Sequence, residues 1–178
     1  MAQYVAFLRA INVGGRTVKM TKLREIFESL GFTDVETFIA SGNVIFKTRS
    51  SNAVALEKKV EQALEKSLGF DVATLIRSTT ELATIVGFDA FPGPGAPAPT
   101  LYVGLLKSAP DDATRARVRA LATATDDFRV EGRELYWVCH TRLMQSIASG
   151  ALLEKTVGMR ATFRNVTTLR KLAAKYCR

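Results

Sequence analysis

The residues best suited to chemistry lie between positions 9 and 20, where two adjacent glycines are flanked by cations and an amide. Gly14 and Gly15 allow left-handed backbone dihedrals and let a ligand approach backbone N–H groups closely. The polar side chains beside them are those of Arg9, Asn12, Arg16 and Lys19. A helix is predicted directly after this stretch, and its N-terminus adds partial positive charge. The combination suits the binding of a phosphate, a carboxylate or a nucleic-acid backbone.

Other kinds of site are poorly supported. The P-loop spacing G-x-x-x-x-G-K-[ST] and the dinucleotide fingerprint G-x-G-x-x-G are both missing from this stretch. The only histidine, His140, adjoins Cys139, and neighbouring side chains on a strand point to opposite faces. One histidine and two distant cysteines fall short of a metal-ligand set, and Ser41 in a tight turn is better explained by turn chemistry than as a nucleophile. We therefore predict no metal and no cofactor, and assign no catalytic residue.

The elements that must position these residues follow a pattern that occurs twice. LEKSLGF (64–70) is similar to LEKTVGM (153–159) at an offset of 89 residues, and FIASGNVIF (38–46) is similar to FRVEGRELY (128–136) at an offset of 90. Because the chain has 178 residues, both offsets are close to half its length. The two matches indicate an internal duplication.

Each half is predicted to contain the order β-α-β-β-α-β followed by a helix. The first half has strands at YVAFL, VETFIA, NVIFK and DVATLIR, and helices from Thr21 to Gly31, from Asn52 to Gly69 and after the capping box Ser78-x-x-Glu81. The second half has strands at LYVGLL, FRVE, ELYWVC and ATFRN, and helices after Ser108-Ala-Pro-Asp111, at ALLEKTVG and at TTLRKLAAKY. The predicted fold class is α+β, with two tandem ferredoxin-like (βαββαβ plus helix) units from an internal duplication.

The predicted domain boundaries follow from composition. Residues 1–90 form the first unit with the expanded Gly-rich loop, 91–99 form a Pro/Gly linker, and 100–178 form the second unit with a basic C-terminal helix. The second unit joins its first strand to its first helix with KSAPDD, whereas the first inserts about eight more residues at the equivalent place. Folding does not require the insertion, so we favour a binding loop over a surface loop without a role.

The net charge of +8 is concentrated in the second half. Residues 90–178 contain 14 Lys/Arg and 7 Asp/Glu, and no acidic residue follows Glu154. A basic segment attracts polyanions, and non-specific, salt-sensitive nucleic-acid binding is one interpretation of it. The other interpretation is a solvated basic helix that aids solubility.

Composition and the N-terminal sequence predict a cytoplasmic protein with no membrane partner. The apolar fraction of 47% and the charged fraction of 24% are typical of a globular protein. No basic segment precedes the first apolar run, unlike in a signal peptide, and no stretch approaches the roughly 20 apolar residues that cross a bilayer. The two cysteines form no close-spaced pair and suit a reducing compartment.

Three motifs carry a resemblance to a known family. They are INVGG after the first strand, LGF-x-x-V-x-T-F-I-x-SGNV-x-F, and LEK-x-x-G-x-x-AT-x-RN-x-x-T-x-x-KL. Together they resemble the bacterial domain-of-unknown-function family numbered 1697 over nearly the whole chain, which implies a two-part α+β fold and supplies no function. The matching positions are Arg9, Asn12, Gly14, Gly15, Ser41, Gly42, Asn43, Arg164, Asn165 and Thr168. The sequence departs from the usual pattern at Ala10, Ala40 and Val166, where Gly, Gln and Trp are common.

These positions lead to one main hypothesis and two alternatives. In the first, the loop 11–20, the turn 41–43 and Arg164-Asn165 form a site for an anionic small molecule, in a binding protein or an enzyme. The arginines would neutralise charge, the asparagines would orient the ligand, and the glycines would supply backbone donors. The alternatives are a nucleic-acid-binding module that uses the basic C-terminal half, and a structural or interaction protein without a ligand.

Overall fold

The structure is a computed structural model that describes residues 1–39, 42–93, 99–141, 146 and 148–177. Its described residues form six helices and two four-stranded antiparallel sheets, so the predicted α+β class is confirmed. None of the helices in these ranges is long and apolar enough to cross a membrane.

The chain divides into two compact units. One consists of Met1–Ala83 with Lys175–Arg178, and the other of Thr84–Ala174. The division into residues 1–90, 91–99 and 100–178 concerns which parts of the chain fold independently, and it stays a prediction.

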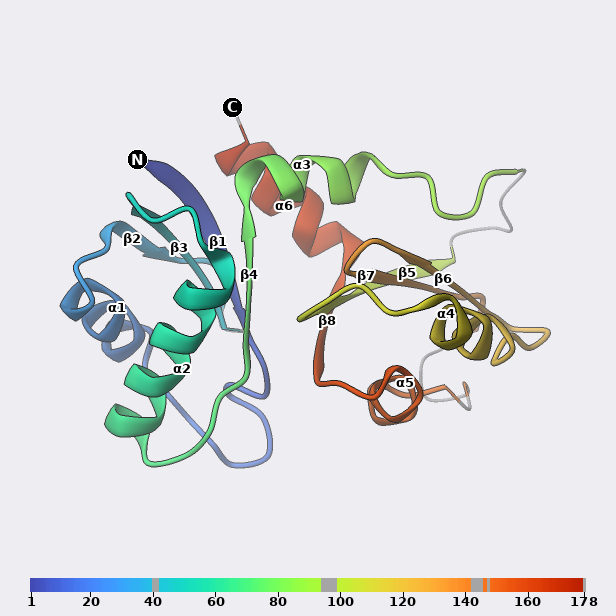
Figure 1. The fold of residues 1–178 in the computed structure, drawn as a ribbon, viewed down its shortest axis with the longest axis horizontal. Helices are drawn as coiled ribbons and strands as arrows, with labels where there is room; N and C mark the ends of the chain where they lie inside the picture. The colour runs from blue at the N-terminus through green and yellow to red at the C-terminus, as the bar shows by residue number, and fades with distance from the viewer. Residues whose placement is uncertain (40–41, 94–98, 142–145, 147, 178) are drawn as a thin grey trace. The chain divides into compact units, whose positions relative to one another are not determined.

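The first unit contains a sheet with the strand order β2-β3-β1-β4. Its strands are β1 (Ala2–Leu8), β2 (Thr33–Thr37), β3 (Asn43–Thr48) and β4 (Thr74–Ser78), and its helices are α1 (Met20–Ser29), α2 (Ala53–Leu68) and the start of α3 (Thr79–Gly87). Helices α1 and α2 cover one face of this sheet (Figure 1). Alternate residues of β1 face these helices, and Tyr4, Ala6 and Leu8 pack there with Leu23 and Phe27 in the core.

The second unit contains a sheet with the corresponding order β6-β7-β5-β8. Its elements are β5 (Thr100–Leu106), α4 (Asp112–Arg119), β6 (Asp126–Glu131), β7 (Glu134–Cys139), α5 (Gly150–Val157), β8 (Ala161–Asn165) and α6 (Val166–Tyr176). Helices α4 and α5 pack against each other over this sheet, and Phe128, Trp137 and Leu153 lie in the core beneath them. The predicted order of strands and helices is confirmed in both halves.

Several helix ends form as their local residues predict. Asn52 Oδ1 accepts a hydrogen bond from Ala55 N at 3.0 Å, which caps α2, and Gly69 ends that helix with a φ of 79°. Ser78 and Glu81 form the predicted capping box, because each side chain accepts a hydrogen bond from the backbone N–H of the other.

Several predicted boundaries in the first unit are wrong; strand β4, for example, begins at Thr74 rather than at Asp71. Helix α1 begins at Met20 with Lys19 as its N-cap, so Thr21 lies inside the first turn. The reason is that Val18, buried and bonded to Asn12, keeps the backbone extended up to Lys19. Strand β2 ends at Thr37 rather than at residue 40, because Ile39 has a left-handed φ of 56° that the strand ladder does not accommodate.

Candidate functional site

The expanded loop predicted between the first strand and the first helix is present. We call residues 9–19, which join β1 to α1, the glycine loop. The equivalent connection in the second unit, from β5 to α4, consists of residues 107–111. The insertion is therefore 6 residues rather than about eight, because α1 begins earlier than its sequence predicts.

The glycine loop is fastened to its own unit. Ile11 and Val18 are buried in the core. Asn12 braces the loop, since its N–H donates to Arg16 O at 2.9 Å and its Oδ1 accepts from Val18 N at 2.7 Å. Arg9 is half-buried at the end of β1, where its backbone N–H donates to Ala73 O at 2.9 Å. The loop therefore has a defined shape before any ligand binds.

The tip of the loop presents backbone donors to solvent. Positive φ values occur at alternate residues, Ala10 (57°), Asn12 (58°) and Gly14 (61°), and again at Gly15 (81°). Alternation of backbone hand turns successive N–H groups toward one side, as in the nests that bind anions. Within the described residues, the N–H groups of Val13, Gly14 and Gly15 donate to no protein acceptor, and a Cβ at either glycine would meet no atom within 4 Å.

The charges of the loop and of the residues on either side of it in the sequence are of one sign. The first acidic residue of the chain is Glu25, and the cations before it are Arg9, Arg16, Lys19, Lys22 and Arg24. The Arg16 guanidinium lies 4.8 Å from the centroid of the Phe70 ring, a cation–π contact that holds it beside the loop. The first turn of α1 contains no acidic residue to neutralise the partial charge of the helix N-terminus. The charged side chains of the loop itself are therefore all cations, whereas the neighbouring segment that contains Phe70 also contains Asp71.

The turn before β3 lies against the glycine loop. Gly42 O accepts a hydrogen bond from Leu8 N at 2.8 Å. A Cβ at Gly42 would lie 3.1 Å from Leu8 Cβ and 3.2 Å from Ile11 Cβ, so a side chain at this position would force its neighbours to move. Asn43 is fully buried, and its Nδ2 donates to Phe38 O at 3.0 Å, which closes the turn. Ser41 lies outside the described residues. Two of the three predicted segments therefore lie side by side in the first unit.

The third predicted segment belongs to the second unit. Arg164 Nη1 donates to Thr162 Oγ1 at 2.8 Å and to Phe163 O at 3.0 Å, and burial lowers the pKa of Arg164 to about 10. Asn165 Oδ1 accepts from Thr167 N at 2.8 Å at the start of α6, on which Thr168 is half-buried. Because these residues and the glycine loop belong to different units, their convergence on one ligand stays a prediction.

The family model described as "Protein of unknown function (DUF1697)" matches residues 1–136 of the chain. The chain belongs to the DUF1697 family. The matched residues include the glycine loop and the turn before β3, and they end before Arg164. In the DUF1697 chain Ala10 has a left-handed φ of 57°, a backbone conformation that glycine adopts most easily.

A solved structure supports the same fold for the whole DUF1697 chain. The conserved bacterial protein SP0830 from Streptococcus pneumoniae matches it with a TM-score of 0.77 and 23% sequence identity, over 100% of this chain and 99% of that chain. At this identity the likeness shows the fold. No curated protein matches the DUF1697 chain significantly in sequence.

The side chains considered for metal binding and covalent chemistry lie as follows in the described residues. Among them, no group of three or more His, Cys, Asp or Glu side chains is placed to hold a metal ion. Cys139 is buried and its thiol donates to Thr141 O, while His140 is exposed. Strand β7 ends at Cys139 and His140 follows it, so the alternation expected of neighbours on a strand does not describe this pair.

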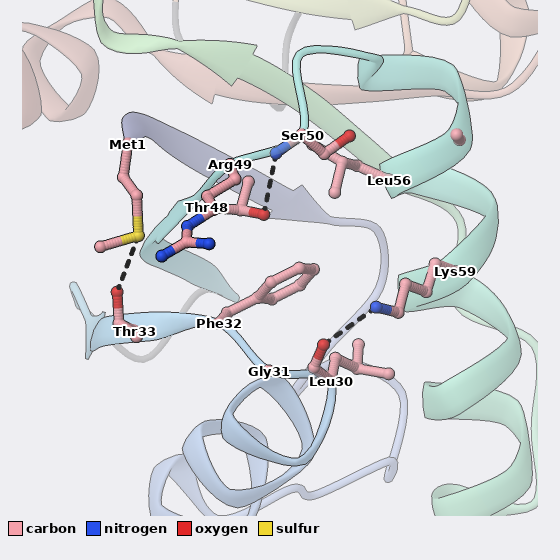
Figure 2. A pocket seen from close by; sticks show the side chains of 11 residues that line it. Met1, Leu30, Gly31, Phe32, Thr33, Thr48, Arg49, Ser50, Leu56 and Lys59 are labelled. Atoms are coloured by element: carbon pink, nitrogen blue, oxygen red, sulfur yellow. Dashed lines mark hydrogen bonds between the residues drawn. The ribbon is translucent and has the colours of Figure 1, made fainter.

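A second feature of the DUF1697 protein was not found from its sequence. A hollow of about 580 Å³ lies in the first unit, between the α1–β2 junction, the end of β3 and the first turns of α2 (Figure 2). Its polar lining includes Arg49, Ser50 and Lys59. In the sequence, the hollow corresponds to the hydroxyl-rich stretch TRSSN at positions 48–52. This stretch is typical of an ordinary connection between elements, and only the fold shows that the α1–β2 junction lies beside it.

Proposed function

We propose that this protein binds an anionic small molecule, through a phosphate or carboxylate group, at the glycine loop. The observation that carries the proposal is the set of N–H groups at Val13, Gly14 and Gly15, which have no protein acceptor in the described chain and lie among cations. An anion would accept hydrogen bonds from these donors and would be neutralised by Arg16 and Lys19. Because the loop is already fastened, binding costs little ordering entropy.

The other predicted residues have supporting roles in this proposal. Asn12 maintains the loop shape, and Gly42 and Asn43 hold the neighbouring turn against it. Arg9 would contribute charge from the end of β1. Arg164, Asn165 and Thr168 would complete the site from the second unit, and this part of the proposal requires Arg9 and Arg164 to lie within about 15 Å of one another, the reach of two side chains around one ligand.

The proposal is tested by titrating isotope-labelled protein with inorganic phosphate, pyrophosphate and citrate at constant ionic strength. We expect saturable changes in the amide resonances of Val13, Gly14 and Gly15, with a higher melting temperature at saturating anion. Asn12→Asp retains an oxygen for Val18 N and tolerates the left-handed backbone, but it places a negative charge in the loop. It should weaken binding at least about tenfold.

A matched control separates the site from net charge. Gln62→Glu makes the same amide-to-carboxylate change on the exposed side of α2, and it should leave the affinity unchanged. Arg164→Gln tests the contribution of the second unit. If this unit completes the site, the variant should bind the anion more weakly than the wild type. Two results would show that the glycine loop is not an anion site. One is the absence of a saturable change in the three amide resonances with phosphate, pyrophosphate and citrate. The other is binding by Asn12→Asp that is as tight as binding by the wild type.

The alternative function, non-specific nucleic-acid binding by the basic C-terminal half, is distinguished by salt. Some of the seven cations after Glu154 already have partners within the protein: Lys175 Nζ lies 2.9 Å from Glu36 Oε2, and Arg164 is half-buried and bonded to residues of its own strand. Retention on DNA or RNA at low salt that weakens steeply as salt rises would favour this function. The other alternative, a structural or interaction protein, predicts that Asn12→Asp alters nothing but stability.

We further propose that both units are ferredoxin-like, that they descend from an internal duplication, and that the protein is cytoplasmic. The corresponding sheet orders β2-β3-β1-β4 and β6-β7-β5-β8 support the first two proposals. Equivalent ladder positions, where Val5 pairs with Arg77 and Val103 with Arg164, support a common origin. Cys139 and Cys177 are both free thiols, which agrees with a reducing compartment.

A further inference from the structure

The hollow of about 580 Å³ and the glycine loop lie at opposite ends of the central strand β1. Ala2 pairs with Thr48, which lines the hollow, whereas Leu8 N bonds to Gly42 O beside the glycine loop. The strand between Ala2 and Leu8 spans about 20 Å, at ~3.4 Å per residue. The hollow is therefore separate from the site proposed above, and its volume lies in the range of small-molecule pockets.

The hollow presents a guanidinium group with no protein partner. Arg49 is exposed and, among the described residues, makes no hydrogen bond or ion pair. Its guanidinium extends over the hollow between Met1 and Phe32 (Figure 2). A guanidinium donates through several N–H groups in a plane, so it pairs well with a carboxylate.

Two hydroxyl groups add donors beside this guanidinium. Thr48 Oγ1 accepts a hydrogen bond from Ser50 N at 3.3 Å, and Ser50 Oγ accepts one from Asn52 N at 3.4 Å. Because each oxygen is an acceptor in these bonds, each O–H proton remains available, and neither has an acceptor among the described residues. Both hydroxyl groups can therefore donate to a ligand in the hollow.

The remaining charge of the hollow is also positive. Lys59 Nζ donates to Leu30 O at 2.9 Å and lies 5.4 Å from the centroid of the Phe32 ring, which fixes the ammonium at one wall (Figure 2). Of the described residues that line the hollow, none is acidic. The polar side of the hollow thus offers donors and positive charge, which only an acceptor group such as an anion matches.

The other side of the hollow is apolar and rigid. Phe32 is only 5% exposed, and its ring stacks on Phe46 with a centroid distance of 4.5 Å. Leu56 and Ala55 of α2 line the hollow beside it. A fixed aromatic and aliphatic wall favours a ligand with an apolar body over an inorganic ion.

We propose that this hollow is a second binding site, specific for a small organic monocarboxylate with an aliphatic or aromatic body. Arg49 pairs with the carboxylate, the hydroxyl groups of Thr48 and Ser50 donate to it, and Phe32 and Leu56 contact the apolar body. Arg49 supplies the guanidinium that has no partner in the described chain, whereas the Lys59 ammonium is held at the wall by its bond to a carbonyl oxygen and adds positive charge there.

The test is a titration of isotope-labelled protein with benzoate, indole-3-acetate and octanoate, each compared with the neutral amide of the same body. We expect saturable shifts of the Gly31, Thr33 and Ser50 amides with at least one carboxylate, and binding of its amide at least about tenfold weaker. Arg49→Gln should weaken carboxylate binding by a similar factor and leave thermal unfolding unchanged, because Arg49 is exposed and makes no bond within the described chain. Lys58→Gln, an exposed neighbour of Lys59 outside the hollow, removes the same charge and should change nothing.

Three results would overturn this proposal. They are equal binding of carboxylate and amide, full retention of binding in Arg49→Gln, and no saturable shift of these amides with any of the three carboxylates at millimolar concentration. The two sites are distinguished by testing each variant with the ligand of the other site. Asn12→Asp should leave carboxylate binding in the hollow intact, and Arg49→Gln should leave phosphate binding at the glycine loop intact, so either site can fail without the other.

Discussion

Arg77 and Arg164 occupy equivalent positions in the two sheets. Each pairs across the ladder with a valine of the central strand, and Nη1 of each donates to the carbonyl oxygen of the preceding residue at 3.0 Å. A guanidinium removed from water is costly unless it is hydrogen-bonded. The same placement of this costly side chain in both sheets extends their likeness from strand order to individual contacts.

The two arginines should differ in their contribution to stability. Arg77 is fully buried and Arg164 half-buried. We expect Arg77→Ala to lower the free energy of unfolding by about 3 kcal/mol or more, since its buried partners lose their donor, and Arg164→Ala by about 1 kcal/mol. Urea denaturation followed by circular dichroism measures both. Arg77→Met keeps most of the volume without a charge and should cost less than Arg77→Ala; equal losses for Arg77→Ala and Arg164→Ala would contradict this account.

A buried carboxylate in the second unit makes stability depend on pH. Asp126 is 1% exposed, and its Oδ1 accepts from Trp137 Nε1 at 2.7 Å and from Ser146 Oγ at 2.9 Å, while its Oδ2 accepts from Thr125 Oγ1 at 2.9 Å. Burial alone would raise the pKa of Asp126, but the hydrogen bonds from Trp137, Ser146 and Thr125 outweigh it and lower that pKa.

The lowered pKa of Asp126 determines the direction of the pH effect. The carboxylate contributes stability above its unfolded-state pKa of about 3.9, and this contribution is lost as the pH falls through the lower folded-state value. We therefore expect the free energy of unfolding to fall below about pH 4. Asp126→Asn should be less stable at pH 7, by about 1–3 kcal/mol, and should lack this part of the acid dependence.

The acid transition has an internal reporter, because Trp137 is the only tryptophan. Its emission should change as Asp126 becomes protonated, and Asp126→Asn should remove that change. Emission in the wild type that stays constant down to acid unfolding would show that the Trp137–Asp126 bond does not sense the charge.

Gly42 and Gly15 provide a matched test of the turn that supports the glycine loop. Both have positive φ, 72° and 81°, so alanine at either position costs about 1–2 kcal/mol of backbone strain. Only at Gly42 would the new Cβ also crowd neighbouring atoms, Leu8 Cβ at 3.1 Å and Ile11 Cβ at 3.2 Å. Gly42→Ala should therefore lower the melting temperature more than Gly15→Ala in differential scanning calorimetry. The reverse order would mean that the turn can move away from β1 freely.

The packing of an aromatic ring against β5 requires a glycine at position 104. A Cβ at Gly104 in β5 would lie 2.5 Å from Cε1 of Phe163 on β8, which is closer than atoms can pack. Gly104→Ala should lower the free energy of unfolding by about 1–3 kcal/mol, the usual cost of overpacking. Combining it with Phe163→Leu, which removes the ring, should recover part of that loss in a double-mutant cycle. Strict additivity of the two changes would exclude this contact as the cause.

The sequence was most informative where a structure depends on residues near one another along the chain. The Asn52 cap, the Ser78–Glu81 capping box and the terminating Gly69 each involve positions within about one helical turn, so their residue types suffice to predict them. The order of strands and helices follows from hydrophobic periodicity, which is also local.

By itself, the sequence determined the class, the element order, the family resemblance and the presence of an expanded loop. Tertiary structure alone decided that Asn12 braces this loop through Val18, that three of its amides remain without a protein acceptor in the described chain, and that Arg49 extends over a hollow beside Phe32. The physical reason is that a hydrogen-bond donor is free only when no acceptor, including those far away in the sequence, lies within hydrogen-bond distance. Only the packing of strands and helices in three dimensions sets those distances.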